Sequence, residues 1–271
     1  MKLTICNEMF EDWDLSDVFH KAKEIGYEAV EIAPYTIKDS AFDITPSERE
    51  AIRRAAEEVG IEIAGLHWLF VKPEGLHVNG PDAALREKTR DYLLELVRLC
   101  SDLGGKVMVI GSPKQRNVVE GVTDEQAFEW ARETFRASAE LAGERDVLLC
   151  FEPLNSEITN FITTPDEALT LIEAVDHPNF QMILDVYSSS VEKLDIPAEI
   201  RKHADRIRHV HTNDDNGYVP GSGGADYPAI IAALREVGYD GYLSVEVFDF
   251  KPDPITIAQQ SYDFLRGLVP A

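Results

Sequence analysis

Four apolar runs in this sequence lead directly into side chains that bind cations: Glu152, Asp185, His211 and Glu246. A short apolar run is typical of a strand buried on both faces, so each of these residues would stand where a strand ends. Carboxylate oxygens and one imidazole nitrogen suit a divalent cation. Any one of the four alone would be weak evidence, but together they predict a site for one divalent metal ion. The ligand set fits Mn²⁺, Mg²⁺ or Co²⁺, and Zn²⁺ is also compatible with it.

Other polar residues follow the predicted strands and are candidates for substrate binding. His67 ends the third strand and could bind a substrate hydroxyl or a second metal, although a packed histidine fits equally well. Lys114 and Arg116, a basic pair after the fourth strand, could hold a phosphate or carboxylate of the substrate. Asn155 and Glu157 follow Glu152, and one of them is expected to contact substrate. A solvated loop is the alternative interpretation for these loop residues.

Several aromatic and acidic residues have two interpretations. Trp13 and Trp68 could form an apolar wall of the pocket, whereas core packing is favoured for Phe248. Glu8 and Glu31, at the ends of the first two strands, could contact substrate or have a structural role. His209 shares a strand face with His211, so it is expected one layer deeper in the protein.

Strand-like and helix-like segments alternate along the whole chain and must position these residues. Capping boxes at Thr45–Glu48, Thr123–Gln126 and Thr164–Glu167 mark three helix starts. Strands are predicted at 2–6, 29–32, 61–66, 106–110, 147–151, 181–184 and 207–211, with an eighth ending at 246–247.

Eight strand–helix units predict an α/β fold, a (β/α)₈ TIM barrel forming a single domain over residues 1–271. The cation-binding residues lie about one βα unit apart, roughly 30 residues. A doubly wound open sheet is the alternative, but no Gly-x-Gly-x-x-Gly motif follows the first strand. In a barrel the carboxyl ends of the strands form one rim, where neighbouring strands can bring the four residues together.

The net charge of the chain limits the kinds of molecule that it can bind. The formal net charge is −23, from 49 acidic and 26 basic residues, which argues against nucleic acid and anionic membrane. No apolar run is long enough to cross a membrane, and the start does not resemble a signal peptide. The three cysteines lie in apolar runs and form no disulfide framework, so a reduced, cytoplasmic protein is expected.

The motifs at the later strand ends resemble a known family. Glu152-Pro153-Leu154-Asn155, Leu184-Asp185, His209-Val210-His211 and the segment 241–246 are similar to the xylose isomerase-like TIM-barrel superfamily. The similarity is greatest to its sugar (phosphate) isomerase/epimerase branch, which includes the ketose 3-epimerases. The resemblance implies that the four residues bind one metal ion and that Glu152 and Glu246 also act as acid and base.

Two positions depart from that family. Ketose epimerases often carry a histidine where this chain has Ser188 and an arginine where it has Gly217. Both residues hold the hydroxyl-rich end of a free ketose in the family. We therefore expect poor activity on unmodified ketohexoses, and a preference for an anionic substrate if Lys114 and Arg116 reach the pocket.

The expected function is metal-dependent isomerisation or epimerisation of a sugar or sugar derivative through an enediolate, as a step of carbohydrate metabolism. A metal-dependent sugar dehydratase or lyase would use the same proton abstraction. A nuclease like endonuclease IV would need a basic groove, which the charge opposes. A non-catalytic sugar-binding barrel would not need two opposed glutamates. The sequence leaves open the substrate, the native metal and the oligomeric state, a homo-oligomer included.

Overall fold

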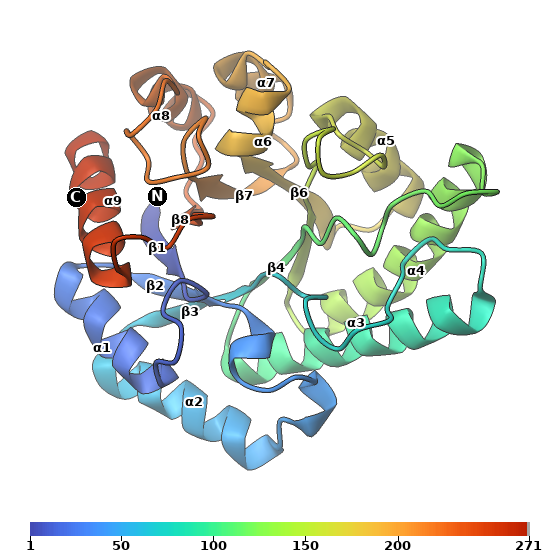
Figure 1. Cartoon of the computed structure of the whole chain (residues 1–271), viewed down its shortest axis with the longest axis horizontal. Helices are drawn as coiled ribbons and strands as arrows, with labels where there is room; N and C mark the ends of the chain where they lie inside the picture. The colour runs from blue at the N-terminus through green and yellow to red at the C-terminus, as the bar shows by residue number, and fades with distance from the viewer. Residues whose placement is uncertain (270–271) are drawn as a thin grey trace.

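The computed structural model describes residues 1–269, in which eight parallel strands close into a barrel in the order β1-β2-β3-β4-β5-β6-β7-β8. Helices surround the strands as an outer ring (Figure 1). The predicted (β/α)₈ TIM barrel is confirmed. Each strand pairs with its sequence neighbours, and β1 also pairs with β8.

The strands are short, and all run in the same direction. They are β1 Lys2–Cys6, β2 Ala29–Ile32, β3 Glu62–Leu66, β4 Val107–Ile110, β5 Leu148–Phe151, β6 Phe180–Asp185, β7 Ile207–Thr212 and β8 Tyr242–Val245.

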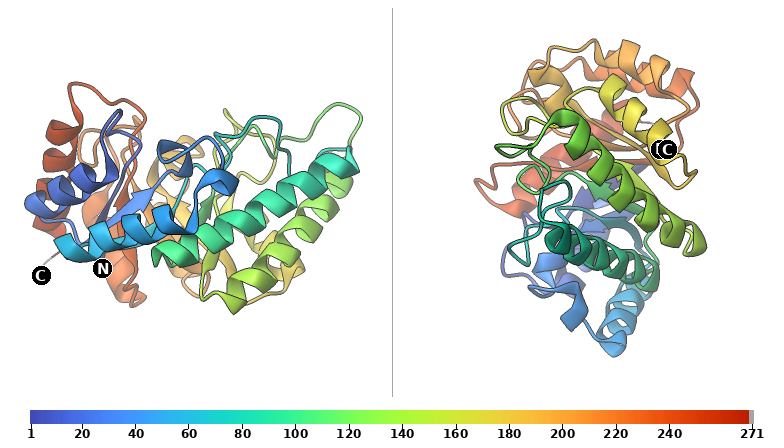
Figure 2. Two further views of the ribbon diagram at one scale, coloured as in Figure 1. Left: turned by 90° about the horizontal axis from the view of Figure 1, so that it is seen from below. Right: turned by 90° about the vertical axis from the view of Figure 1, so that its right-hand side faces the viewer.

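Most helices follow a strand and return the chain to the start of the next strand. They are α1 Leu15–Ile25, α2 Pro46–Val59, α3 Ala83–Leu103, α4 Asp124–Glu144, α5 Pro165–Val175, α6 Val186–Val191, α7 Ile196–Lys202, α8 Tyr227–Glu236 and α9 Pro254–Leu268, with short 3₁₀ turns η1 Pro34–Thr36 and η2 Ala41–Asp43. The long loops gather at one end of the barrel (Figure 2).

The three predicted capping boxes are present at the starts of α2, α4 and α5. The short helix α6 and the two 3₁₀ turns were not predicted. Helix α6 begins directly after β6 and contains three consecutive serines, which are poor helix formers, so it gives little periodic pattern. The side chain of Asp185 accepts a hydrogen bond from the Ser188 backbone N–H and caps this helix.

The interior of the barrel contains an apolar part and a polar part. Val107, Val109, Cys150 and Ile183, from β4, β5 and β6, form an apolar cluster. Strands β2 and β7 instead contribute buried polar groups, among them Glu31 and His209. Because side chains alternate along a strand, Cys150 and Glu152 share the interior face, as do Ile183 and Asp185.

The strand register brings the candidate ligands to a common level. Asp185 on β6 is the direct partner of His211 on β7. Past the ends of the neighbouring strands, the Glu246 backbone N–H donates to Thr212 and the Glu152 N–H donates to Ile110. The four residues therefore meet at the carboxyl ends of adjacent strands.

Within residues 1–269, no helix combines the length and the apolar character that crossing a bilayer requires.

A buried arginine ties the outer helices α2 and α3. Arg49 is 7% exposed and bonds Glu95 at 2.5 Å and Asp102 at 2.9 Å, while its Nε donates to the Ile44 carbonyl. This pairing satisfies a buried cation that would otherwise be costly.

We expect Arg49→Met to lower the free energy of unfolding by about 2–4 kcal/mol, because it removes the donor to Oε1 of Glu95 and to the backbone carbonyls of Ile44 and Ala41. The matched control is Arg54→Met on the same helix, where an exposed pair with Glu50 should contribute less than about 1 kcal/mol. Urea unfolding followed by circular dichroism measures both. Equal losses in the two variants would contradict the assigned role of Arg49.

Candidate metal centre

Four side chains converge at the carboxyl end of the barrel. One ligand atom from each of Glu152, Asp185, His211 and Glu246 lies within 4.8 Å of the others. Asp185 and His211 end β6 and β7, while Glu152 and Glu246 directly follow β5 and β8. All four are at most 4% exposed. The geometry agrees with the four residues that the sequence singles out.

Glu246 is held by two neighbours. Its Oε2 lies 2.9 Å from Nδ1 of His211, and its Oε1 accepts a 2.7 Å hydrogen bond from the indole N–H of Trp68. Burial opposes ionisation of Glu246, but the charge of His211 and its hydrogen bond outweigh burial and lower the pKa of this carboxyl. His211 Nδ1, which also lies 3.8 Å from Glu152 Oε1, therefore faces the shared ligand position.

Asp185 is oriented through both carboxylate oxygens. Oδ1 accepts from the Ser188 backbone N–H at 2.6 Å, and Oδ2 accepts from the Asn213 side-chain amide at 2.7 Å. Burial, followed by repulsion from Glu246, raises the pKa of Asp185 to about 6. The side chain of Asp185 is thus held in one orientation, while burial and Glu246 disfavour its ionised form.

Glu152 occupies a space that only a glycine leaves open. A Cβ on Gly111 would lie 1.8 Å from Oε2 of Glu152, so any larger residue would displace the carboxylate. Burial and then repulsion from Glu246 raise the pKa of Glu152 to about 8. A carboxyl with this pKa is largely protonated at neutral pH in the metal-free protein.

This donor set fits a divalent cation. Three buried carboxyl groups crowd one small volume, and burial, followed by repulsion from Glu246, raises the pKa of Glu152 and Asp185. A cation among them would remove that repulsion, and oxygen ligands with one imidazole match Mn²⁺, Mg²⁺ and Co²⁺. The chemistry of the site therefore favours a bound divalent metal ion but does not determine which metal it is.

A second polar layer lies below the four residues. Glu31 on β2 is fully buried, with Oε2 2.8 Å from Nε2 of His209 and 3.4 Å from Nε2 of His211. Burial opposes its ionisation, but the charges of the two histidines hold the pKa of Glu31 well below the usual range. Glu31 therefore faces the ring nitrogen of His211 that points away from Glu246, and His209 lies one layer deeper, as predicted from strand alternation.

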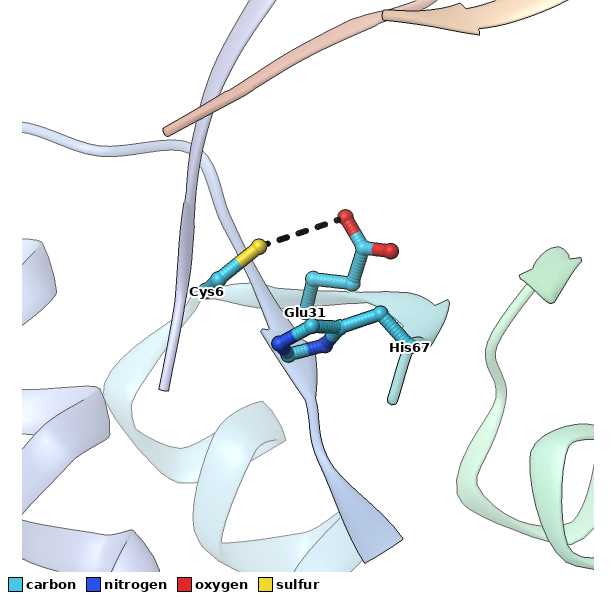
Figure 3. A group of neighbouring side chains, drawn as sticks. All are labelled: Cys6, Glu31 and His67. Carbon is cyan, nitrogen blue, oxygen red and sulfur yellow. Dashed lines mark hydrogen bonds between the residues drawn. The ribbon is translucent and has the colours of Figure 1, made fainter. Parts of the chain in front are cut away.

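Figure 3 shows the edge of this layer, where the side chains of Cys6, Glu31 and His67 point toward one another from β1, β2 and the end of β3. The Cys6 thiol lies 3.8 Å from Glu31, and His67 Nε2 lies 2.6 Å from the Glu8 carboxylate. Glu8 and Glu31, considered for substrate contact, are both buried in this layer. Glu8 is paired with His67 and Glu31 with the histidines of β7, so each of these buried carboxyl groups has a basic partner.

The ligand cluster opens into a cavity of about 430 Å³. Glu152, Glu246, Ser188 and Leu154 line its buried part, together with the half-buried Trp68. Lys114 also lines the cavity, with its side chain exposed. Phe248, which the sequence analysis assigned to the core, instead lines the cavity and is 48% exposed, so that prediction was wrong.

The other candidate substrate-binding residues do not line this cavity. Arg116 is 1% exposed, and its Nη1 donates to the carbonyls of Ile110 and Glu152, so it joins the ends of β4 and β5. Asn155 and His67 are fully buried, and Glu157 is exposed on the β5–α5 loop; none of them lines the cavity. Of the basic pair, only Lys114 reaches it.

Sequence reasoning missed two residues that support the ligands. Asn213 orients Asp185, and Gly111 makes room for Glu152. Strand alternation could have found Asn213, because it directly follows β7 and continues the spacing of residues 209 and 211. Gly111 gives no comparable sequence pattern, since only the close approach of another strand reveals its role.

A closed parallel barrel with candidate catalytic carboxylates at its strand ends is the architecture of TIM-barrel enzymes. The family model described as "Xylose isomerase-like TIM barrel" matches residues 19–268. The chain belongs to this family, which confirms the resemblance noted in the sequence.

Sequence relatives include a D-psicose 3-epimerase of Enterocloster bolteae, 25% identical over 88% of this chain and 79% of the relative. Another is a 3-dehydro-D-guloside 4-epimerase of Escherichia coli, 24% identical over 98% of this chain and 99% of the relative. Among solved structures, a D-psicose 3-epimerase crystallised with D-fructose superposes with a TM-score of 0.85 at 20% identity, covering 99% of both chains. That structural likeness supports the same fold.

We expect Glu31→Gln to weaken Mn²⁺ binding about 10- to 100-fold, because a carboxylate behind a ligating imidazole fixes its orientation and raises its basicity. Isothermal titration calorimetry measures the affinity. The control is Glu28→Gln, on the segment just before β2, whose carboxylate accepts a hydrogen bond from the Leu3 backbone outside this layer. Unchanged Mn²⁺ affinity in a folded Glu31→Gln variant would contradict a role behind His211.

Metal affinity should rise with pH between about 6 and 8. The pKa of Glu152 is raised to about 8, that of Asp185 to about 6, and that of His211 well above its usual value, since Glu246 and Glu31 outweigh the effect of burial. All three bind protons that a cation must displace, so lower pH weakens metal binding.

Calorimetry with Mn²⁺ in buffers of different ionisation enthalpy measures the protons released. We expect about one ion per chain and net proton release near pH 7. Asp185→Ala should lose most of this binding while its circular dichroism spectrum stays that of the wild type. Affinity that is independent of pH, or full metal content in Asp185→Ala, would contradict this site.

Proposed function

We propose that this protein is a metal-dependent isomerase or epimerase acting on a sugar or sugar derivative. One observation carries the proposal: Glu152 and Glu246 belong to the four-residue ligand cluster and also line the adjoining cavity. Two carboxyl groups can therefore face one bound substrate, a requirement of proton transfer that binding alone does not impose.

Glu152, Asp185, His211 and Glu246 would hold the cation. When bound, a divalent cation supplies positive charge next to the substrate oxygens on which negative charge develops. Mn²⁺ is our first choice, with Mg²⁺ and Co²⁺ as alternatives, because oxygen ligands predominate.

The two glutamates would carry the proton. One carboxylate removes the hydrogen on the carbon next to the substrate carbonyl, and the electrons of that C–H bond form the carbon–carbon double bond of an enediolate. The other carboxyl returns a proton to the same carbon from the opposite face, which inverts it. A return to the neighbouring carbonyl carbon would instead move the carbonyl.

The placement of the two residues favours inversion. Glu152 follows β5 and Glu246 follows β8, so they approach the ligand cluster from either side of β6 and β7. The relatives named D-psicose 3-epimerase and 3-dehydro-D-guloside 4-epimerase are both epimerases, which supports the same outcome here. We therefore propose epimerisation next to a carbonyl as the reaction.

Replacing either glutamate should stop proton transfer. Glu→Gln keeps the shape and one ligating oxygen, while loss of a general acid or base typically costs 10²- to 10⁴-fold in rate. In D₂O, with a keto sugar that the wild type turns over, wild-type protein should incorporate deuterium at the carbon next to the carbonyl. We expect Glu152→Gln and Glu246→Gln each to epimerise at least about 100-fold more slowly.

The metal content of each variant must be measured in parallel, so that loss of metal is separated from loss of proton transfer. Glu120→Gln, an exposed residue in the loop before α4, is the matched control and should exchange at the wild-type rate. If metal-loaded Glu152→Gln and Glu246→Gln both exchange that hydrogen as fast as the wild type, the proposed mechanism is wrong.

A further inference from the structure

The rim of the cavity is unusually apolar for a sugar site. Five large apolar side chains in residues 1–269 are well exposed, namely Phe42, Val71, Ile158, Phe248 and Ile255. Three of them, Val71, Ile158 and Phe248, line the cavity that also contains Glu152 and Glu246. Single exposed apolar residues need no explanation, but a cluster around a binding cavity indicates a ligand surface.

These three residues, defined here as the apolar rim, come from separate parts of the chain. Val71 lies in the β3–α3 connection, Ile158 in the β5–α5 connection and Phe248 in the β8–α9 connection. The barrel brings them together around the opening, and Tyr187 from α6 packs against Phe248 with ring centroids 5.5 Å apart.

Gly217 helps to place Phe248 in this rim. Its carbonyl accepts a hydrogen bond from the Phe248 backbone, and a Cβ at position 217 would lie 3.1 Å from the Phe248 ring. Gly217 also has a φ of +71°, which other residues rarely adopt. The aromatic ring therefore lies against a position that has no side chain to compete for the space.

Two of the polar side chains that line the opening already form hydrogen bonds within the protein. The Gln115 amide donates to the Phe70 carbonyl, and the Ser112 hydroxyl accepts from the Phe70 N–H. The cavity thus has carboxyl groups in its buried part and an apolar rim at its exposed edge, with the Lys114 ammonium beside it.

We propose that the substrate is a keto sugar bearing an apolar substituent, such as an aryl or branched alkyl group in glycosidic linkage, with its carbonyl on a carbon other than the anomeric one. The sugar lies against Glu152 and Glu246, and the substituent covers Val71, Ile158 and Phe248. This inference rests on the proposed function, since it places the reacting sugar in the same cavity, and it names the substrate class that the proposed function leaves general.

The test compares two probes that differ only in the substituent, methyl and phenyl β-D-glucopyranoside. Both lack the carbonyl, so they bind to Mn²⁺-loaded protein without reacting. Calorimetry should show the phenyl glycoside binding roughly 10- to 100-fold more tightly, as expected for burial of an aromatic ring. In the double variant Ile158→Ser/Phe248→Ser the two probes should bind within about threefold of each other, because that apolar surface has been removed.

The matched control is Ile255→Ser/Phe42→Ser, which removes the same two residue types from exposed positions outside the cavity. It should keep the phenyl preference of the wild type. Equal binding of the two probes to the wild type, or a phenyl preference that survives in Ile158→Ser/Phe248→Ser, would overturn the proposal. Tighter binding of a glucoside 6-phosphate than of the phenyl glycoside would also overturn it, in favour of an anion at Lys114.

A second copy of this chain is the other candidate to cover the rim. Light scattering after size exclusion should give the same mass for wild type and Phe248→Asp. A wild-type dimer that becomes a monomer in Phe248→Asp, but not in Ile255→Ser/Phe42→Ser, would overturn the proposal. Deuterium exchange separates this inference from the proposed function. If the wild type prefers the phenyl glycoside but exchanges no deuterium with any keto sugar, the proposed reaction is wrong and the apolar subsite stands. If it exchanges deuterium but does not prefer the phenyl glycoside, the apolar substituent is wrong and the reaction stands.

Discussion

The repulsion among buried carboxyl groups at the carboxyl end of the barrel is the constraint on which the site depends. Glu152, Asp185 and Glu246 approach one another with almost no solvent to screen their charges. Burial and mutual repulsion raise the pKa of Glu152 and Asp185, whereas contact with His211 lowers that of Glu246. A folded chain keeps such a cluster only where surrounding contacts hold it, and a cation removes much of its cost.

Those contacts come from the fold itself. The register of β6 and β7 sets Asp185 beside His211, the missing side chain at Gly111 admits Glu152, and Trp68 holds Glu246. One layer deeper, Glu31 balances the histidines of β7. Cys150 and Ile183 of the apolar cluster lie one layer deeper than Glu152 and Asp185 on the same strand faces, so the ligand cluster rests on both polar and apolar residues.

At this end of the barrel, the residues proposed for the reaction and those proposed to recognise the substrate come from different parts of the chain. Residues at or just after the strand ends, fixed by the sheet, supply the carboxyl groups and the imidazole, while the longer connections supply the apolar rim. Loops can change residue type without disturbing the register of the strands, and for this reason one barrel can serve many substrates. In this chain Ser188 and Gly217 have short or absent side chains, and Phe248 of the apolar rim lies against Gly217 and Tyr187.

The sequence by itself determined the barrel, the three capping boxes and the four candidate ligands, because each depends on local order: apolar runs, caps and the residue that ends a strand. It could not decide which loop residues face the cavity, since a side chain six residues past a strand can turn inward or outward. Arg116 is therefore buried against backbone carbonyls, Phe248 lies at the rim rather than in the core, and Lys114 alone of the basic pair lines the cavity. Gly111 and Asn213 matter only through residues distant in sequence, and only the pairing of β4 with β5 and of β6 with β7 brings them into contact with Glu152 and Asp185.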